Sequence, residues 1–280
     1  MAKRCKEDIT GGGARHSISS ESLKRVDIRL DFSGVIAIDN WVERLVDDLL
    51  GNIFPNSRIS EVKSVMSDLG ALQVAADIVG YPVDKFARMP VYIFDNGKLE
   101  NLHDSLRLSI SETFVELTVS CNGYKGIDPY LEFIGEVSDS LLSAHRMAIL
   151  RRFAIRKLNG FMDSDFDKIR NSVNIDMFLN KALPLDEGYE TEYKDFYRIK
   201  NLDMAYVRDS RLFRVGRQND MPVYQAILDL EGSLDFRKSS AWRRPNKKNL
   251  IEIAQRTNDI LLGLFRQVLT EEYISSHTKS

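Results

Sequence analysis

The sequence predicts an α+β protein made of two halves, each with an antiparallel sheet covered by helices, and ending in a long C-terminal helix. Segments with apolar residues at every second position alternate with segments at helical spacing. Charged residues fill the other positions of the strands, which is typical of antiparallel sheets with one solvated face. The order strand, helix, strands, helix occurs twice. We therefore expect a flexible tail at 1–22, an N-terminal half at 23–145 and a C-terminal half at 146–280.

Composition restricts the class of protein. The chain has 280 residues, with 39 basic against 41 acidic side chains and a net charge of −2, so it lacks the long-range positive field of a strongly basic nucleic-acid binder. Cys5 and Cys121 are too few for a disulfide framework, which favours a reducing compartment. Neither a signal peptide nor an apolar run of about 20 residues is visible, so we expect a cytoplasmic protein without membrane contact.

The first half opens with a polar, glycine-containing tail, which we expect to order only on a partner. Val26, Ile28, Leu30 and Phe32 alternate with charged residues and predict a strand over 23–35. The remaining predicted elements of this half are a helix at 39–51, a helix near 59–69, a β-meander from 91 to 121 and a helix at 129–143.

The second half repeats this succession of patterns. In chain order we predict a strand at 147–159, a helix at 165–183, an acidic loop at 186–192, strands at 196–201, 205–216 and 223–236, and one helix over 248–273. The last helix is long enough to cross a whole sheet.

Residues for metal or cofactor chemistry are sparse. His103 and His145 are the histidines of the predicted body, and the chain has no zinc-binding spacing. Asp163, Asp165 and Asp167 resemble the start of a calcium loop, but the start of a helix with acidic first-turn residues explains them better. We expect no metal and no cofactor.

Signatures of catalysis are also missing. Gly11, Gly12 and Gly13 precede the first strand and have no Lys-Ser or Lys-Thr partner, so they do not form a phosphate-binding loop. The chain has no G-x-S-x-G elbow and no cysteine beside a histidine. We therefore expect a protein that is not an enzyme, with an unmarked carboxylate site as a third hypothesis.

The strand R-R-F-A-I-R-K-L-N carries the pattern with most chemical content. Alternation places Arg152 and Arg156 on one face, on either side of Ala154, where they could grip a polyanion. The favoured interpretation is structural: Asp229 and Glu231 share a face of a later strand, and the four residues form an ion network under a covering helix.

A second basic segment lies before the last helix. It comprises Arg237, Lys238, Trp242, Arg243, Arg244, Lys247 and Lys248. Clustered charge and a tryptophan are typical of nucleic-acid contacts, but such a segment is more often a solvated connector.

Four stretches occur in an order that resembles a sporadically distributed, uncharacterised bacterial family. They are the helix start Y-K-G-I-D-P-Y-L-E-F at 124–133, the strand 152–159, the segment I-L-D-L-E at 227–231, and the terminal helix with Leu261, Phe265, Leu269 and Thr270. The chain departs from the family pattern at Ile127, Ala154 and Lys157. The resemblance implies a bacterial cytoplasmic protein from mobile or defence-associated gene clusters, and it supplies no catalytic residues.

Together these observations predict a non-enzymatic interaction protein, such as an accessory, sensor or neutralising subunit. We expect it to bind another protein, encoded nearby, through a sheet edge or the terminal helix, and self-association is a further option. The alternative is a nucleic-acid- or nucleotide-binding module that uses the basic segment at 237–248.

Overall fold

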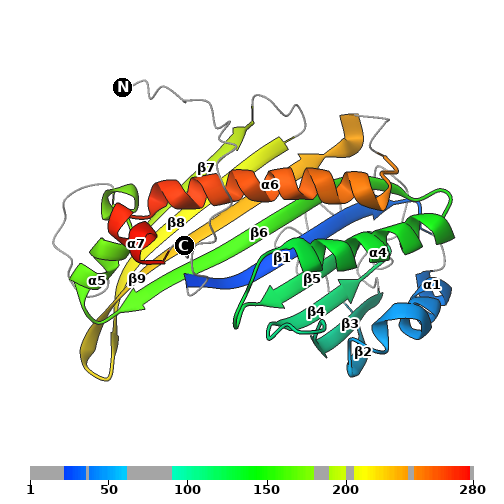
Figure 1. Ribbon diagram of the computed structural model, residues 1–280, viewed down its shortest axis with the longest axis horizontal. Helices are drawn as coiled ribbons and strands as arrows, with labels where there is room; N and C mark the ends of the chain where they lie inside the picture. Colours follow the sequence, from blue (N-terminus) through cyan, green and yellow to red (C-terminus); the bar gives the residue numbers. More distant parts are fainter. Residues whose placement is uncertain are drawn as a thin grey trace, which may run out of the picture.

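The computed structural model describes residues 22–35, 38–61, 90–179, 189–199, 205–238 and 243–277. The fold is mixed α+β: nine described strands form one antiparallel sheet in the order β2-β3-β4-β5-β1-β6-β9-β8-β7 (Figure 1). The strands are β1 (Leu23–Ser33), β2 (Asn56–Glu61), β3 (Pro90–Gly97), β4 (Ser105–Ile110), β5 (Phe114–Ser120), β6 (Ile149–Asp163), β7 (Glu190–Arg198), β8 (Ala205–Gln218) and β9 (Met221–Asp235). The helices are α1 (Ile38–Leu45), the π-helix η2 (Val46–Leu50), α4 (Asp128–Ala144), α5 (Phe166–Ser172), the 3₁₀-helices η3 (Ile175–Met177) and η4 (Phe236–Lys238), α6 (Lys247–Val268) and α7 (Glu271–His277).

Strand β1 joins the two predicted halves. It pairs with β5 on one side and with β6 on the other, so that Ile28 lies between Leu117 and Ile155. All three side chains are fully buried. The arrangement as two halves with separate sheets is therefore not confirmed, because the described strands of both predicted halves belong to one sheet. Alternation in a sequence shows which side chains share a face, but not which strands become neighbours.

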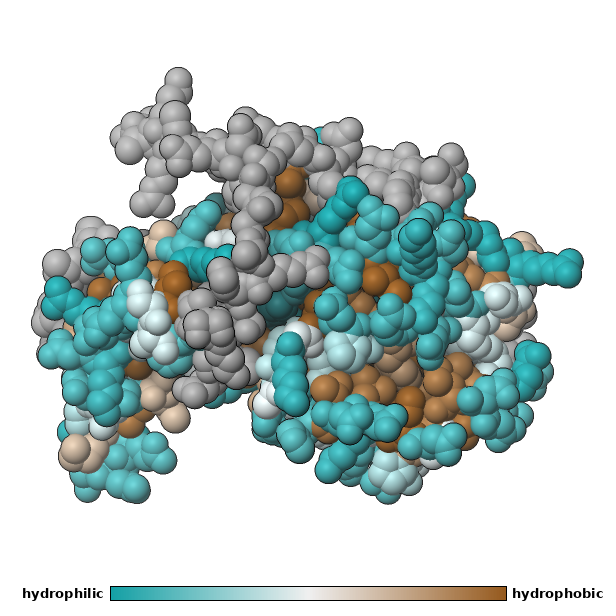
Figure 2. Space-filling model, viewed as in Figure 1, coloured by the Kyte–Doolittle hydropathy of each residue, from teal (hydrophilic) through white to brown (hydrophobic). Residues whose placement is uncertain are grey.

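Helices α4 and α6 cover one face of this sheet (Figure 1). Leu250, Ala254, Leu261 and Val268 recur at helical spacing along α6 and are buried. Gly232 of β9 lets α6 approach, since a Cβ atom at that position would lie 2.6 Å from the Thr257 Cγ2 atom. In the view of Figure 2 hydrophilic residues predominate over the described part of this side of the molecule. No described helix is both long and apolar enough to cross a bilayer.

The predicted terminal helix is wrong in one respect: it ends at Val268 and a second helix, α7, begins at Glu271. Leu269 has an extended backbone and forms an isolated β-bridge with Val173. The Thr270 N–H then donates to the Ser172 carbonyl at 3.2 Å. These tertiary hydrogen bonds replace the helical ones, and a Leu-Thr pair gives no local sign of such a break.

Other predicted boundaries also change. Residues 59–61 lie in strand β2 and not in a helix, while the rest of the helix predicted at 59–69 falls outside the described residues. In the predicted acidic loop, residues 190–192 belong to strand β7, where Glu190 is opposite Arg214 of β8. The strand predicted at 147–159 runs from Ile149 to Asp163. The sequence of β7 is polar, and the segment is a strand because it pairs with β8 along its whole length. The tail predicted at 1–22 lies almost wholly outside the described residues.

Candidate functional site

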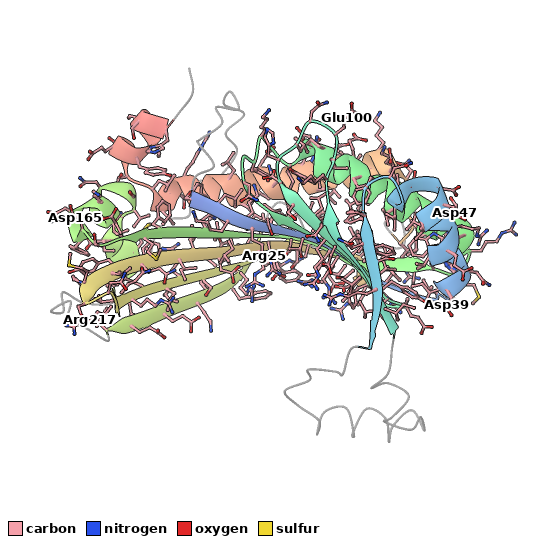
Figure 3. The ribbon with its side chains drawn as sticks, turned by 90° about the horizontal axis from the view of Figure 1, so that it is seen from below. Arg25, Asp39, Asp47, Glu100, Asp165 and Arg217 are labelled. Carbon is pink, nitrogen blue, oxygen red and sulfur yellow. The ribbon has the colours of Figure 1, made fainter. Side chains whose placement is uncertain are left out.

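The face of the sheet opposite α4 and α6 is here called the open face. Figure 3 shows α4 and α6 on one side of the sheet and a dense layer of side chains on the other. The period-two pattern of the sequence creates this division. In β1, Val26, Ile28 and Leu30 are buried on the helix side, so Asp27 and Arg29 between them point to the open face.

Strand register aligns the polar residues of the open face in two rows across the middle of the sheet. The first row contains Thr118, Asp27, Arg156, Glu231, Arg208 and Phe196. The second contains Glu116, Arg29, Ala154, Ser233 and Tyr206. Charges of opposite sign therefore alternate between neighbouring strands, an arrangement that stabilises the pairing.

Arg152, Arg156, Asp229 and Glu231 are brought together on this face. Arg156 donates to both oxygens of Asp229, from Nε and from Nη2, each at 2.7 Å. This hydrogen bonding raises the pKa of Arg156 above its ordinary value. Arg152 donates to Glu231 and forms an ion pair with Asp31 of β1 at 3.3 Å. The network thus links β1, β6 and β9.

Arg208 of β8 completes this network. Its Nη2 atom lies 3.0 Å from Glu231 and 3.5 Å from Asp229. Its Nε–H is buried and has no acceptor in the described part of the chain. Side-chain exposure is 41% for Arg208 but only 15% for Asp229 and 18% for Glu231. The carboxylates are therefore set into the sheet, while the guanidinium groups reach outward from it.

The position of the network corrects one part of the prediction. We expected Arg152, Arg156, Asp229 and Glu231 to lie under a covering helix, but α6 packs on the opposite face of β9, over Gly232. Asp229 and Glu231 point the other way because a strand turns successive side chains to opposite faces. The ion network consequently faces solvent.

Strands β1 and β5 extend the charged surface. Asp27 is only 7% exposed and accepts from Arg25 at 2.7 Å and from the Thr118 hydroxyl at 2.8 Å. Arg29 lies 2.7 Å from Asp31 and 3.9 Å from Glu116. Burial raises the pKa of Glu116.

Two adjoining hollows are set into the open face. The central hollow, about 220 Å³, is lined by Asp27, Arg29, Glu116, Arg152, Ala154, Arg156, Arg208 and Glu231. The aromatic hollow, about 490 Å³, is lined by Arg152, Phe196, Tyr206, Arg208, Glu231, Ser233, Asp235 and Arg237. Phe196 is 66% exposed and stacks on Tyr206, with ring centroids 5.5 Å apart and an interplanar angle of 11°. The small side chain of Ala154 makes room between its larger neighbours.

The residues of the basic segment at 237–248 do not form one surface. Arg237 lines the aromatic hollow and its Nε donates to Asp235 at 2.9 Å. Arg244 is turned to the end of α4, where it donates to the carbonyls of Leu142, His145, Arg146 and Ala148. A guanidinium in this position satisfies carbonyls left free at a helix C-terminus.

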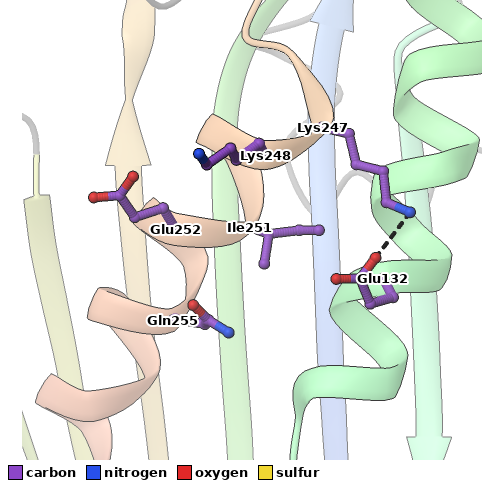
Figure 4. Close-up of a pocket in the computed structure, with 6 residues that line it drawn as sticks. All are labelled: Glu132, Lys247, Lys248, Ile251, Glu252 and Gln255. Atoms are coloured by element: carbon purple, nitrogen blue, oxygen red, sulfur yellow. Dashed lines mark ion pairs between the residues drawn. The ribbon is translucent and has the colours of Figure 1, made fainter.

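The remaining members of this segment lie apart. Lys247 lines a groove of about 480 Å³ between α4 and α6 and forms an ion pair with Glu132 at 2.8 Å (Figure 4). It forms a second ion pair with Glu136 at 3.2 Å. Lys248 lines the same groove and is exposed. Arg243 is exposed, and its carbonyl accepts from the Leu150 N–H. The side chain of Lys238 and all of Trp242 lie outside what the structure describes.

The structure also shows the surroundings of the candidate metal ligands and of the cysteine thiol. Within the described ranges, no group of three or more His, Cys, Asp or Glu side chains is arranged to hold a metal ion. Asp165 caps helix α5 by accepting from the Asp167 N–H at 3.0 Å. Cys121 is a free thiol whose pKa burial raises to about 12, which disfavours the reactive thiolate.

Sequence reasoning missed the parts of the site that depend on strand order. The alternating charges of β1 indicated a solvated face, but not that Asp31 would meet Arg152. Phe196 and Tyr206 gave no separate signal, because their stacking requires β7 and β8 to pair. No family model, curated protein or solved structure matches the chain, so the interpretation of the site rests on its geometry.

Proposed function

We propose that the protein is a non-enzymatic interaction protein that binds another protein on the open face of its sheet. The observation that carries the proposal is that no helix among the described residues covers one face of the central strands, which carries arginines and a stacked aromatic pair. This replaces the sheet edge or the terminal helix, which the sequence alone favoured as the binding element.

Residue types on the open face suit a protein partner. Arginine and aromatic residues are the ones most often responsible for binding energy at protein interfaces. Arg152 and Arg208 lie beside Phe196 and Tyr206 around one hollow. Phe196 offers an exposed apolar contact, and the guanidinium groups around it can bind carboxylates in a fixed geometry.

The charge pattern favours a partner with charges of both signs. Each of Arg29, Arg152, Arg156 and Arg208 already has a carboxylate within 4 Å. A polyanion would meet these carboxylates as well as the arginines, whereas a mixed protein surface can match an alternating pattern. The basic segment gives the nucleic-acid alternative little support, since Arg244 and Lys247 are used to fasten α4 and α6.

Affinity capture with matched variants tests the proposal. The products of neighbouring genes, to which the family resemblance directs attention, are co-expressed with the tagged full chain. One bait carries Phe196→Ala and Arg208→Ala on the open face, and a control carries Lys248→Ala on α6. We expect a partner that the wild type and the Lys248→Ala control retain equally and that the double variant loses by at least tenfold.

Folding must be separated from binding in this comparison. Phe196 and Arg208 are both well exposed, so the double variant should keep the circular dichroism spectrum of the wild type. A partner that the folded double variant captures as well as the wild type would place the interface elsewhere. Loss of the partner on Lys248→Ala alone would assign it to the α4–α6 groove.

A further inference from the structure

Beyond a protein partner, we propose that the open face binds a free nucleotide, with its base on the Phe196–Tyr206 stack and its phosphates on the Arg152 and Arg208 guanidinium groups. The proposal concerns the chain alone and requires no partner. It names a ligand for the aromatic hollow, whose volume of about 490 Å³ lies within the range of small-molecule sites.

The aromatic pair supplies a surface for a base. Phe196 and Tyr206 stack within 11° of parallel, and Phe196 remains 66% exposed on the outer side of the stack. A core aromatic is covered by apolar neighbours, whereas this ring borders a hollow that is otherwise lined by polar residues. Nucleobases stack on such exposed rings whatever their identity, because every base has a π-face.

Phosphate-binding groups lie next to this surface. Register places Phe196 directly opposite Arg208 on the neighbouring strand, so the ring and the guanidinium lie on the same face one strand apart. Arg152 and Arg208 line both hollows, and Arg237 lines the aromatic one. Guanidinium groups bind phosphate oxygens in pairs and so fix the orientation of the phosphate.

Arg208 gives an independent sign of a missing acceptor. Its Nε–H is buried and lacks a hydrogen-bond partner in the described part of the chain, although Nη2 has two carboxylates nearby. Buried donors of charged groups are nearly always satisfied in folded proteins. The rest of the Arg208 side chain is 41% exposed and lines both hollows, where its guanidinium can donate to a phosphate oxygen.

Carboxylates around the hollow favour a nucleotide over a polymer. Glu231 and Asp235 line the aromatic hollow and can accept hydrogen bonds from ribose hydroxyls. The same carboxylates repel a long phosphate backbone, which needs a continuous excess of cations along its path. A ligand with one short phosphate group and a hydroxylated sugar matches this set of donors and acceptors.

Equilibrium binding to the purified full chain tests the proposal. Isothermal titration calorimetry is performed with the four nucleoside 5′-diphosphates, inorganic phosphate and a single-stranded ten-nucleotide RNA. We expect at least one diphosphate to bind with a micromolar Kd and inorganic phosphate to bind at least tenfold more weakly. Phe196→Ala and Arg208→Gln should each weaken the diphosphate at least tenfold, while Lys248→Ala should leave its Kd unchanged.

Three results would overturn the proposal. One is the absence of binding by any diphosphate below 1 mM. Another is a Kd that Phe196→Ala and Arg208→Gln leave unchanged, which would place the ligand elsewhere. The third is tighter binding of the RNA than of every diphosphate, which would indicate a nucleic-acid ligand. None of these three results decides whether a protein partner is captured on the open face, so the two proposals can fail separately.

Discussion

Arg156 and Lys157 are neighbours in the chain with opposite surroundings. Arg156 points to the open face, where hydrogen bonds with Asp229 raise its pKa. Lys157 points to the helix side, opposite Val26 and Leu230, and its Nζ atom lies 5.8 Å from the centroid of the Tyr124 ring. Burial lowers the pKa of Lys157 to about 8. The Arg156 charge is therefore stabilised on the open face, whereas the Lys157 charge destabilises the fold.

Replacing Lys157 with methionine should stabilise the protein at neutral pH. The folded-state pKa of about 8 lies below the unfolded value, so the folded state binds fewer protons between pH 8 and 10.5 and wild-type stability gains with rising pH there. We expect Lys157→Met to raise the free energy of unfolding at pH 7 by about 1 kcal/mol or more. Urea denaturation should show this advantage shrinking between pH 8 and 10.5.

The control for this experiment is Lys248→Met, at an exposed lysine of α6. It should change the free energy of unfolding by less than about 0.5 kcal/mol at both pH 7 and pH 10.5. An advantage of Lys157→Met that stays constant from pH 7 to pH 10.5 would show that Lys157 is not desolvated in the folded protein.

Residue patterns allowed the face of each polar side chain to be predicted. The alternation of 152–158 correctly separated Arg152 and Arg156 from the buried Phe153 and Ile155. It could not show that α6 packs on the opposite face and leaves the polar face without a helix from the described part of the chain. It also could not place Arg208 beside Glu231, a contact that follows from the pairing of β8 with β9.

Helix α6 approaches strand β9 closely at Gly232. A Cβ atom on Gly232 would lie 2.6 Å from the Thr257 Cγ2 atom and 3.4 Å from Leu261. Thr257 cannot easily turn away, because its hydroxyl donates to the Ile253 carbonyl at 2.9 Å. The distance between the last helix and the sheet is therefore set by the absence of a side chain at this position.

Gly232→Ala should destabilise the protein by about 1–3 kcal/mol, since it overpacks the contact between α6 and β9. Gly216→Ala is the matched control within β8, where a new Cβ atom would have no neighbour within 4 Å. We expect the control to be neutral or slightly stabilising, because alanine restricts the unfolded chain. Equal thermal midpoints for both variants would contradict this account of the helix–sheet contact.

Elements with a strong local pattern were predicted well, and those set by tertiary contacts were not. Strand β1 and helix α4 match the predicted segments closely, because their apolar residues follow one clear period. Strand β7 is polar and was missed in part, since its stability depends on pairing with β8. The break after α6 escaped prediction because Leu269 forms a β-bridge with Val173, a residue far away in the sequence, through hydrogen bonds that their neighbours make.

At the scale of the whole molecule, one sheet runs through both predicted halves. Strand β1 pairs with β6 from Leu23 to Ser33, and Arg152 forms an ion pair with Asp31 across this junction. Hydrophobic residues from both sides form one core. Because β1 pairs with both β5 and β6, it belongs to the sheet of both predicted halves.

The described body should therefore unfold in one cooperative transition. A Trp242→Phe variant leaves Trp41, which is buried in α1, as the single tryptophan reporter of the N-terminal half. Far-ultraviolet circular dichroism reports the helices, most of all α6 in the C-terminal half. We expect both signals to give the same urea midpoint. Two separate midpoints would show that the halves fold independently.

We propose above all that a protein partner binds the open face. Hydroxyl-radical footprinting of the complex with the captured partner tests this most directly. Phe196 on the open face and Met147 outside it are 66% and 72% exposed, so both should be oxidised readily in the free protein. On binding, oxidation of Phe196 should fall at least threefold while that of Met147 stays the same. Undiminished oxidation of Phe196 in a saturated complex would contradict the claim.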